Sequence, residues 1–409
     1  MHVDRSLRRR VAIVADDLTG ALDAGLQFAV RGLDARVSLG LAPQTEADVM
    51  VLNADSRAAA LPEAVARVQQ AAAVCAGRHV YKKLDSTMRG HLGPECVALR
   101  DALGLEVAVI APAFAAAGRT VEGGQLLVDG APVHRIALAN DPQWPAHTAD
   151  VVAIAQRGVS EPVALIPLSV VRGGPSLLAE ALAAAPLAVV EAVQAGDLAR
   201  IAQAIVFGGL AALPCGSAGL AAAWADALQL AGAHHQAYHG RRGPVLLVTG
   251  SRNAATLAQL EALRTTGVVA WCELTLPASP AAAAEAGLAA RTALASGTDV
   301  VLSASLGSMV PGAATTVAAN LGRAAHMALS AGEGLAGLVL TGGDTALQVS
   351  RAVAIAALSI AAAIEPGIPG SLVVGGAYEG LAVVTKAGGF GSRHALLSAV
   401  DWIRNGNVR

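Results

Sequence analysis

The chain has 409 residues, of which 54% are hydrophobic and 15% are charged, and its formal net charge is −2. A single core usually stops growing at roughly 250–300 residues, so we expect two domains. The balanced charge offers no extended basic patch, which argues against a nucleic-acid partner. The four cysteines lie far apart without CxxC spacing, and this fits a reducing cytoplasm rather than a disulfide framework.

Short runs rich in Val, Ile and Leu alternate with Ala- and Leu-rich segments of helical length, which is typical of βαβ units and a mainly parallel sheet. A Gly- and Pro-rich stretch, 118–144, interrupts this alternation and contains a hairpin signal at Asp129-Gly130, so we expect it to pass over the strand ends. In the first part, the predicted strands cover 11–15, 35–39, 49–53, 79–82, 107–111, 163–166 and 187–191, and the predicted helices cover 20–31, 61–76, 92–103, 174–185 and 195–207.

The longest uncharged stretch, 201–225, has the length of a bilayer span. It contains Gly208, Gly209, Pro214 and Gly216, which favour a helix end, a buried strand, a turn and a helix start instead. The basic N-terminus is followed by only five apolar residues, 11–15, which is short for a signal peptide. We therefore expect a cytoplasmic protein without a membrane partner.

The segment 231–244 carries three histidines, two arginines and several glycines, and the apolar pattern stops on both sides of it. We interpret it as an interdomain linker rather than a metal site, and we assign no metal ligands. The predicted fold is two α/β domains, 1–230 and 245–409, each with a mainly parallel sheet flanked by helices. In the second domain, the predicted strands cover 245–249, 268–274, 300–304, 337–341 and two within 371–384, and the predicted helices cover 254–265, 281–295, 313–331, 345–355 and 392–405.

Polar side chains follow four predicted strands of the first domain. The carboxyl ends of parallel strands form the ligand crevice of an open sheet. Lys and Arg neutralise a carboxylate or phosphate there, and Asp or Ser can bond hydroxyl groups. Helix capping explains one or two such turns but not all four, so the pattern predicts a site for a small, anionic, hydroxyl-bearing molecule. The residues are Asp16, Asp17 and Thr19; Arg57; Lys82, Lys83, Asp85, Ser86 and Arg89; and Arg119.

The strand ends of the second domain carry glycine instead of charge, in 249–251, 341–345 and 385–392. Glycine lets backbone N–H groups approach an anion closely, and a following helix adds the positive end of its dipole, so these turns suit a polyphosphate. Neither a Walker loop nor a GxGxxG turn after the first strand is present. Together, the two kinds of strand end predict transfer of a phosphoryl group in the cleft between the domains.

With these motifs in order over nearly the whole chain, the sequence resembles the four-carbon acid sugar kinase family. The matching stretches include ADDLTGALD (15–23), DSR (55–57), KKLDSTMRG (82–90), Asp141-Pro142, TGGDTA (341–346) and TKAGGFG (385–391). The resemblance implies an ATP-dependent enzyme that phosphorylates the terminal hydroxyl of threonate, erythronate or 3-oxo-tetronate, with Mg²⁺ bridging the phosphates. A homodimer is plausible because the Ala-rich helices are very apolar.

The resemblance also implies how the residues divide between the two ligands. Two departures from the family pattern bear on this: Leu22 and Ala24 on the substrate side, and Arg252-Asn253 on the phosphate side. The general base stays open between Asp17 and Asp344, and we favour Asp17 as a hydroxyl ligand. By this resemblance the acid would be bound by Asp16 or Asp17, Arg57, Lys82, Lys83, Asp85 and Ser86, and ATP by Ser251, Gly342, Gly343, Asp344, Thr345 and Gly388. From the pattern of strand ends we add Thr19 and Arg89 for the acid and Lys386 and Gly389 for ATP.

Two other functions fit parts of the pattern. An aldolase could form a Schiff base between Lys82 or Lys83 and a keto-acid, and it would work without ATP. A sensor that binds a sugar acid and a nucleotide would bind both ligands without turnover. The first alternative leaves the three glycine-rich turns without a purpose.

Overall fold

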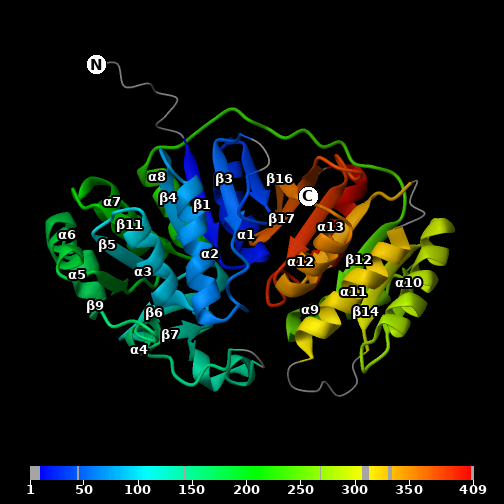
Figure 1. Ribbon diagram of the computed structural model, residues 1–409, viewed down its shortest axis with the longest axis horizontal. Coiled ribbons are helices and arrows are strands. Elements are labelled where there is room, and N and C mark those ends of the chain that lie inside the picture. The colour runs from blue at the N-terminus through cyan, green and yellow to red at the C-terminus, as the bar shows by residue number, and fades with distance from the viewer. Residues whose placement is uncertain are drawn as a thin grey trace. The chain divides into compact units, whose positions relative to one another are not determined.

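The computed structural model describes residues 10–43, 46–141, 144–267, 269–305, 313–329 and 334–406. The chain forms two compact units, Met1–Ala233 and His234–Arg409, which we call unit 1 and unit 2. In each unit the strands form a mainly parallel sheet with helices packed against it (Figure 1). The predicted α/β class is therefore confirmed for both.

Within unit 1 the strand order is β2-β3-β1-β4-β11-β5-β10-β9, and every neighbouring pair is parallel. The strands are β1 (Val11–Ala15), β2 (Ala35–Ser38), β3 (Val49–Asn53), β4 (His79–Lys83), β5 (Val107–Ala111), β9 (Val163–Ile166), β10 (Leu187–Val190) and β11 (Ala212–Gly216). The helices are α1 (Leu18–Ala29), α2 (Leu61–Val74), α3 (Leu92–Ala102), α4 (Val151–Ala155), α5 (Leu168–Arg172), α6 (Pro175–Ala183), α7 (Ala195–Phe207) and α8 (Ala218–Ala227).

The centre of this sheet is β1, in which all five residues are buried, as expected for a strand covered on both faces. Helices α2 and α3 lie over one face, in front of the strands in Figure 1, and α2, α3 and α4 share one hydrophobic core with the sheet. On the other face, the Trp224 ring of α8 packs 6.4 Å from Phe28 of α1 and 5.6 Å from Tyr81 of β4, measured between ring centroids. Both faces of β1 are thus closed, and only its ends can carry a polar site.

Within unit 2 the order is β13-β14-β12-β15-β18-β17-β16, parallel as far as β18 and antiparallel beyond it. Helices α9 and α13 contact each other, and α11 lies between α10 and α12. The strands are β12 (Val245–Thr249), β13 (Val269–Leu274), β14 (Asp299–Ala304), β15 (Gly337–Thr341), β16 (Ala357–Glu365), β17 (Ile368–Val374) and β18 (Ala382–Lys386), and the helices are α9 (Ala254–Arg264), α10 (Pro280–Ala295), α11 (Ala314–Leu329), α12 (Gly343–Ala352) and α13 (Ala395–Asn405).

Most predicted elements are present with shifted ends, but the short helices α4 and α5, strand β16 and the small sheet within 118–144 were not predicted. Strand β16 pairs with β17 as an antiparallel ribbon, and no pattern in the sequence predicted it. The stretch 118–144 contains a small antiparallel sheet of β6 (Arg119–Glu122), β7 (Gln125–Val128) and β8 (Ala131–Pro132), with the predicted turn at Asp129-Gly130. Its Pro142, and Val268 at the start of one predicted strand, lie outside the described residues.

The stretch 201–225 divides as predicted into the end of α7, strand β11 and most of α8. Among the residues that the structure describes, no helix is both long and apolar enough to cross a bilayer. The segment 231–244 has neither helix nor strand, but it is hydrogen-bonded to each unit. Gly232 N donates to Arg31 O in unit 1, and the Tyr238 hydroxyl donates to Ile403 O in unit 2.

Candidate functional site

Three of the polar strand ends in unit 1 are direct neighbours. Strand β1 lies between β3 and β4, and its last residue, Ala15, is in register with Asn53 and Lys83. The turns that follow therefore begin at the same level of the sheet. The fourth predicted strand end, after β5, is separated from β4 by β11, so Arg119 starts from a more distant position.

Arg57 joins two of these turns. Its Nε and Nη2 donate to Asp16 at 2.7 and 2.9 Å, and its Nη1 and Nη2 donate to Asp17 at 3.0 and 2.9 Å. Burial opposes the charge of the guanidinium, but Asp16 and Asp17 raise the pKa of Arg57 well above its usual value. The backbone N–H groups of Ser56 and Arg57 also donate to Asp16 O, which fixes the two turns together.

Asp17 also begins helix α1. Its Oδ1 accepts from Gly20 N at 2.9 Å, and its Oδ2 accepts from the Thr19 hydroxyl at 2.8 Å. This cap starts the helix at Leu18, two residues before the predicted start. Burial opposes ionisation, but Arg57, Lys83 and the Thr19 bond together lower the pKa of Asp17.

Lys83 extends to the same helix start. A Cβ placed on Gly20 would lie 3.1 Å from Lys83 Nζ and 2.5 Å from Asp17 Oδ1, so only glycine allows both groups to approach here. The ammonium donates to Leu84 O at 2.6 Å. Lys83 is buried, and it contributes a positive charge next to the Asp17 carboxylate.

The third turn is held by an ion pair between Asp85 and Arg89. Arg89 Nε donates to Asp85 Oδ2 at 2.7 Å, and its Nη1 donates to Asp141 at 3.2 Å. Burial opposes the effect, but Arg89 and Arg57 hold the pKa of Asp85 far below its usual value. Asp85 and Ser86 are buried, whereas the Arg89 side chain is 31% exposed. Arg89 is therefore a cation of this turn that solvent can reach.

Lys82 is placed differently from the other predicted ligands. Its ammonium lies 2.8 Å from Glu95 Oε2, and both side chains are buried at 0% and 2% exposure. Burial opposes the charge, but Glu95 and Asp16 raise the pKa of Lys82, so it stays protonated. Glu95, on α3, was not predicted, because no local spacing links it to Lys82. Breaking such a buried pair costs about 3–5 kcal/mol, which gives Lys82 a structural role within the site.

Asp23 is a second residue that the sequence reasoning did not assign to the site. It lies on α1 four residues after Thr19, and this spacing puts both on one helix face. Its Oδ1 is buried without a hydrogen-bond partner in the structure. Burial raises the pKa of Asp23 to about 6, although Lys83 nearby opposes the shift.

The described cluster in unit 1 therefore combines three carboxylates with three cations and nearby hydroxyls. The carboxylates are those of Asp16, Asp17 and Asp85, and the cations are those of Arg57, Lys83 and Arg89. Such a set can accept hydrogen bonds from hydroxyl groups and donate them to a carboxylate. It suits a small molecule that carries both.

The three glycine turns of unit 2 also follow neighbouring strands, because β15 lies between β12 and β18. The turns contact one another closely. A Cβ on Gly250 would lie 2.5 Å from the Thr345 hydroxyl, and a Cβ on Gly388 would overlap the Ser251 hydroxyl. Side chains larger than glycine would therefore push the turns apart and cover the backbone N–H groups.

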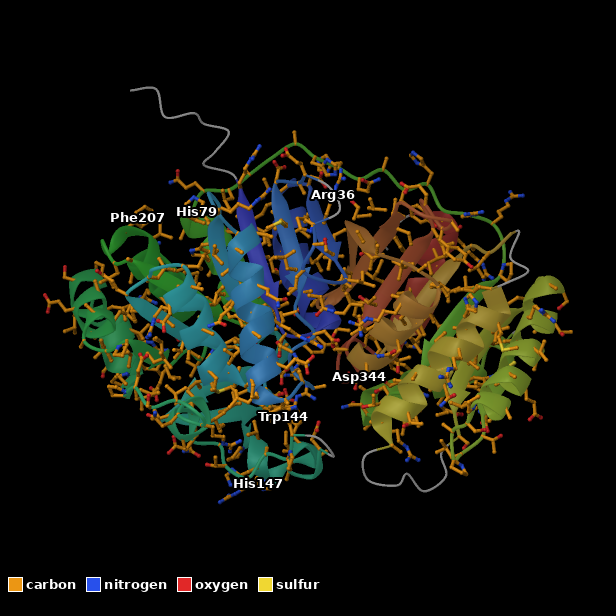
Figure 2. All side chains as sticks on the ribbon, viewed as in Figure 1. Arg36, His79, Trp144, His147, Phe207 and Asp344 are labelled. Atoms are coloured by element: carbon orange, nitrogen blue, oxygen red, sulfur yellow. The ribbon has the colours of Figure 1, made fainter. Side chains whose placement is uncertain are left out.

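The middle turn carries Gly342, Gly343, Asp344 and Thr345. Gly342 has a φ of 95°, a backbone conformation that favours glycine, and its N–H donates to Lys386 O. Helix α12 begins at Gly343, so Asp344 lies in its first turn, where Figure 2 labels it. A helix start supplies N–H donors for an anion, and the carboxylate supplies oxygen ligands for a cation bound with that anion.

The side chain of Lys386, the last residue of β18, points into the loop that follows this strand. Its ammonium donates to the carbonyl oxygens of Ala387, Gly388 and Phe390 at 3.0–3.2 Å, and to the Thr256 hydroxyl at 3.2 Å. Burial lowers the pKa of Lys386 to about 8, although Glu365 opposes the shift. Because its carbonyl groups turn inward to Lys386, the loop has a fixed conformation. Gly389 lies at its exposed side.

The chain contains three lysines, Lys82, Lys83 and Lys386, and all three are buried. Each is in one of the two candidate sites, whereas arginine supplies the other cations. Across the described parts of the chain, no three His, Cys, Asp or Glu side chains gather in a way that could hold a metal ion on their own.

Comparison with known families gives two matches that cover most of the chain. The sequence model described as Sugar-binding N-terminal domain matches residues 11–224. The one described as Nucleotide-binding C-terminal domain matches residues 246–396.

Curated relatives match over nearly the full length. A D-threonate kinase of Bordetella bronchiseptica is 36% identical, with 96% of this chain and 97% of the relative covered. A D-erythronate kinase of Heliobacterium modesticaldum is 31% identical over 96% and 97% of the two chains. A 3-oxo-tetronate kinase of Cupriavidus necator is 30% identical over 94% and 95%.

Solved structures share the fold. A Salmonella typhimurium protein described as a putative tRNA synthase superposes with a TM-score of 0.78 at 21% identity, covering 95% of this chain and 98% of the other. A Haemophilus influenzae protein of the DUF1537 family superposes with a TM-score of 0.67 at 22% identity, with the same coverage. At this level of identity the likeness concerns the fold alone.

Proposed function

Because the chain belongs to the four-carbon acid sugar kinase family, we propose that it transfers the γ-phosphoryl group of ATP to the terminal hydroxyl of threonate, erythronate or 3-oxo-tetronate. The hydroxyl oxygen forms a bond to phosphorus, the bond from phosphorus to the β-phosphate oxygen breaks, and the hydroxyl proton is released. The products are ADP and the 4-phosphate of the acid. The observation that carries this proposal is the row of three glycine turns on β12, β15 and β18.

We assign acid binding to the cluster of unit 1. Lys83 and Arg89 are the cations for the carboxylate of the acid, and Asp16, Asp17 and Ser86 are partners for its hydroxyls. Arg57 acts mainly through Asp16 and Asp17, since its donors already engage both. The lowered pKa of Asp17 suits a hydroxyl ligand better than a general base, because a base works best with a pKa near the operating pH.

We assign ATP binding to unit 2, with the phosphates on the glycine turns near Ser251, Gly343 and Thr345. The Asp344 carboxylate fits Mg²⁺, which in such sites is usually held by one or two carboxylates together with the substrate phosphates. The ion would neutralise charge on the transferred phosphoryl group. Phosphoryl transfer depends mainly on positioning and charge stabilisation, so a strong general base is not required.

The two other functions are less well supported. A Schiff base requires a neutral, accessible amine, and Lys82 is buried and kept charged by Glu95. Lys83 is also buried, next to Asp17. A sensor without turnover is less well supported because the curated relatives that match nearly the whole chain are kinases.

The proposal is tested by ADP release from Mg-ATP, measured with threonate, erythronate, 3-oxo-tetronate and longer aldonates. We expect strong release with one four-carbon acid and little with the longer acids. Asp344→Asn should lose most of this turnover, and Glu285→Gln, which removes an exposed charge on α10, should retain it. No acid-dependent release with any of the three acids would contradict the proposed substrate class.

We further propose that the reaction takes place in the cytoplasm and that the enzyme is a homodimer. The first proposal rests on the four cysteines, which are all buried free thiols. The second rests on the apolar, Ala-rich helices and is tested by light scattering of the purified protein.

A further inference from the structure

Unit 2 contains a cavity of about 240 Å³ that the phosphate-binding residues only border. It is lined by α9 and by the ends of β12, β14 and β13, which are adjacent in that order. Gly250 and Ser251 line its β12 side, and Trp271 lines its β13 side. The volume is below the roughly 300–1,000 Å³ of a complete small-molecule site. It therefore fits one part of a ligand whose remainder lies on the glycine turns.

The β13 side of this cavity is aromatic and aliphatic. Trp271 is partly exposed, and the Arg264 guanidinium carbon lies 4.4 Å from the centre of its ring. Leu257 and Leu260 of α9 line the same cavity, and Leu257 is 37% exposed. A flat ring with exposed aliphatic neighbours suits the stacking of a planar heteroaromatic group.

The cavity lining carries two carboxylates, those of Glu261 and Glu273, and two guanidinium groups, that of Arg252 beside the glycine turn and that of Arg264 over the Trp271 ring. Carboxylates accept hydrogen bonds from amino and hydroxyl groups, which a purine and a ribose carry. The phosphates of a nucleotide are thus favoured at Gly250 and Ser251, and its uncharged part is favoured beside Trp271.

We propose that this cavity is the nucleoside subsite of unit 2, in which a purine base stacks on Trp271. The inference rests on the proposed function, since the phosphates must occupy the glycine turns for the base to extend into the cavity. It assigns Trp271 as a specificity-determining residue. Arg264 is a positioning residue, because it contacts the indole ring.

The test compares Trp271→Ala and Trp271→Phe with the wild-type enzyme, using the full chain. Adenosine and inorganic tripolyphosphate serve as separate competitors, one without phosphate and one without a base. We expect Trp271→Ala to raise the KM for ATP about tenfold and to weaken inhibition by adenosine to a similar degree, as expected for loss of one stacked base. Inhibition by tripolyphosphate and the KM for the acid should stay within about twofold, and Trp271→Phe should recover most of the adenosine inhibition.

Leu288→Ala, an exposed change on α10, is the matched control and should behave as wild type. The inference is overturned if Trp271→Ala leaves adenosine inhibition unchanged, or if it weakens tripolyphosphate and adenosine equally, since either result removes the link to the base. Failure of the proposed function is distinguishable, because it appears as absence of acid-dependent turnover in the wild-type enzyme. Adenosine and ADP binding by calorimetry still test the subsite in that case.

Discussion

Arg57 is the residue on which the geometry of unit 1 depends most. One planar guanidinium bonds two carboxylates from the turn after β1, while its own backbone N–H is bonded to the same turn. A lysine has no comparable fork of donors and cannot bridge both carboxylates in this way.

We therefore expect Arg57→Ala and Arg57→Lys both to reduce kcat/KM for the acid by about a hundredfold or more, as misplacement of positioning groups does. Arg200→Ala, which removes a half-exposed arginine of α7, should have no such effect. Steady-state kinetics of the three variants give the comparison. Near-wild-type kinetics for a folded Arg57→Lys enzyme would show that the bridge is dispensable.

Asp23 gives unit 1 a pH-dependent stability. The pKa of Asp23 is about 6 in the folded chain, against 3.8 for an aspartate without the shift, which we take for the unfolded chain. The folded form therefore binds more protons than the unfolded form between these pH values. The free energy of unfolding contributed by this group therefore falls as the pH rises from about 4 to about 6. The shift corresponds to roughly 3 kcal/mol.

Asp23→Asn replaces the acid with a neutral group and should remove this dependence. We expect its stability relative to wild type to increase from pH 4 to pH 7, measured by urea unfolding. Glu180→Gln, an exposed change on α6, should run parallel to wild type. Parallel curves for Asp23→Asn as well would mean that Asp23 does not titrate in this range.

Individual side chains also mark the limit of what the sequence predicted. The sequence identified Lys82, Lys83, Asp85 and Arg89 as one polar run, but it did not show that their side chains have different partners. Lys82 points to Glu95 of α3, and Arg89 reaches Asp141. These partners depend on how α3 and the 118–144 stretch pack, and the spacing of residues along the sequence does not predict that packing.

At the level of elements, the loop after β18 is held in place by hydrogen bonds that two side chains donate to its carbonyl oxygens. Lys386 bonds three of its carbonyl oxygens, and Gln259 of α9 donates to Phe390, Gly391 and Ser392. At its far end, Ser392 donates to Glu365 from both its N–H and its hydroxyl. A glycine-rich loop is thereby held in one conformation before any ligand binds.

Lys386→Met removes the central donor and leaves carbonyl groups unpaired. We expect the KM for ATP to rise about tenfold, since unsatisfied buried groups cost roughly 1–3 kcal/mol and the loop will rearrange. The KM for the acid should change by less than about twofold. Arg291→Met on α10 serves as the control, and an equal effect on both substrates would contradict a role confined to this loop.

The elements with clear periodicity were predicted well. Strands β1, β12 and β15 and helix α7 have the predicted bounds, because apolar runs flanked by acids or glycines define them. Strand β16 was missed because its alanines favour a helix locally, and only pairing with β17 makes the segment a strand. The short strands β6 to β8 depend on contacts across the 118–144 stretch in the same way.

At the scale of the whole molecule, each unit carries its candidate site at the carboxyl ends of its own parallel strands, and the chemistry of the two sites differs. In unit 1 the neighbouring strand ends carry charge, and in unit 2 they carry glycine. This difference was visible in the sequence, and it is the basis on which we propose a different ligand for each unit. The side-chain pairs within each site, and the cavity beside Trp271, required the folded structure.

In the proposed reaction, phosphorus moves from ATP to the terminal oxygen of a four-carbon acid, and ³¹P NMR of the reaction mixture detects this transfer most directly. We predict that ADP and a phosphomonoester coupled to the C4 protons of the acid form in equal amounts. Release of inorganic phosphate in place of the ester, or conversion of the acid in the absence of ATP, would contradict the account.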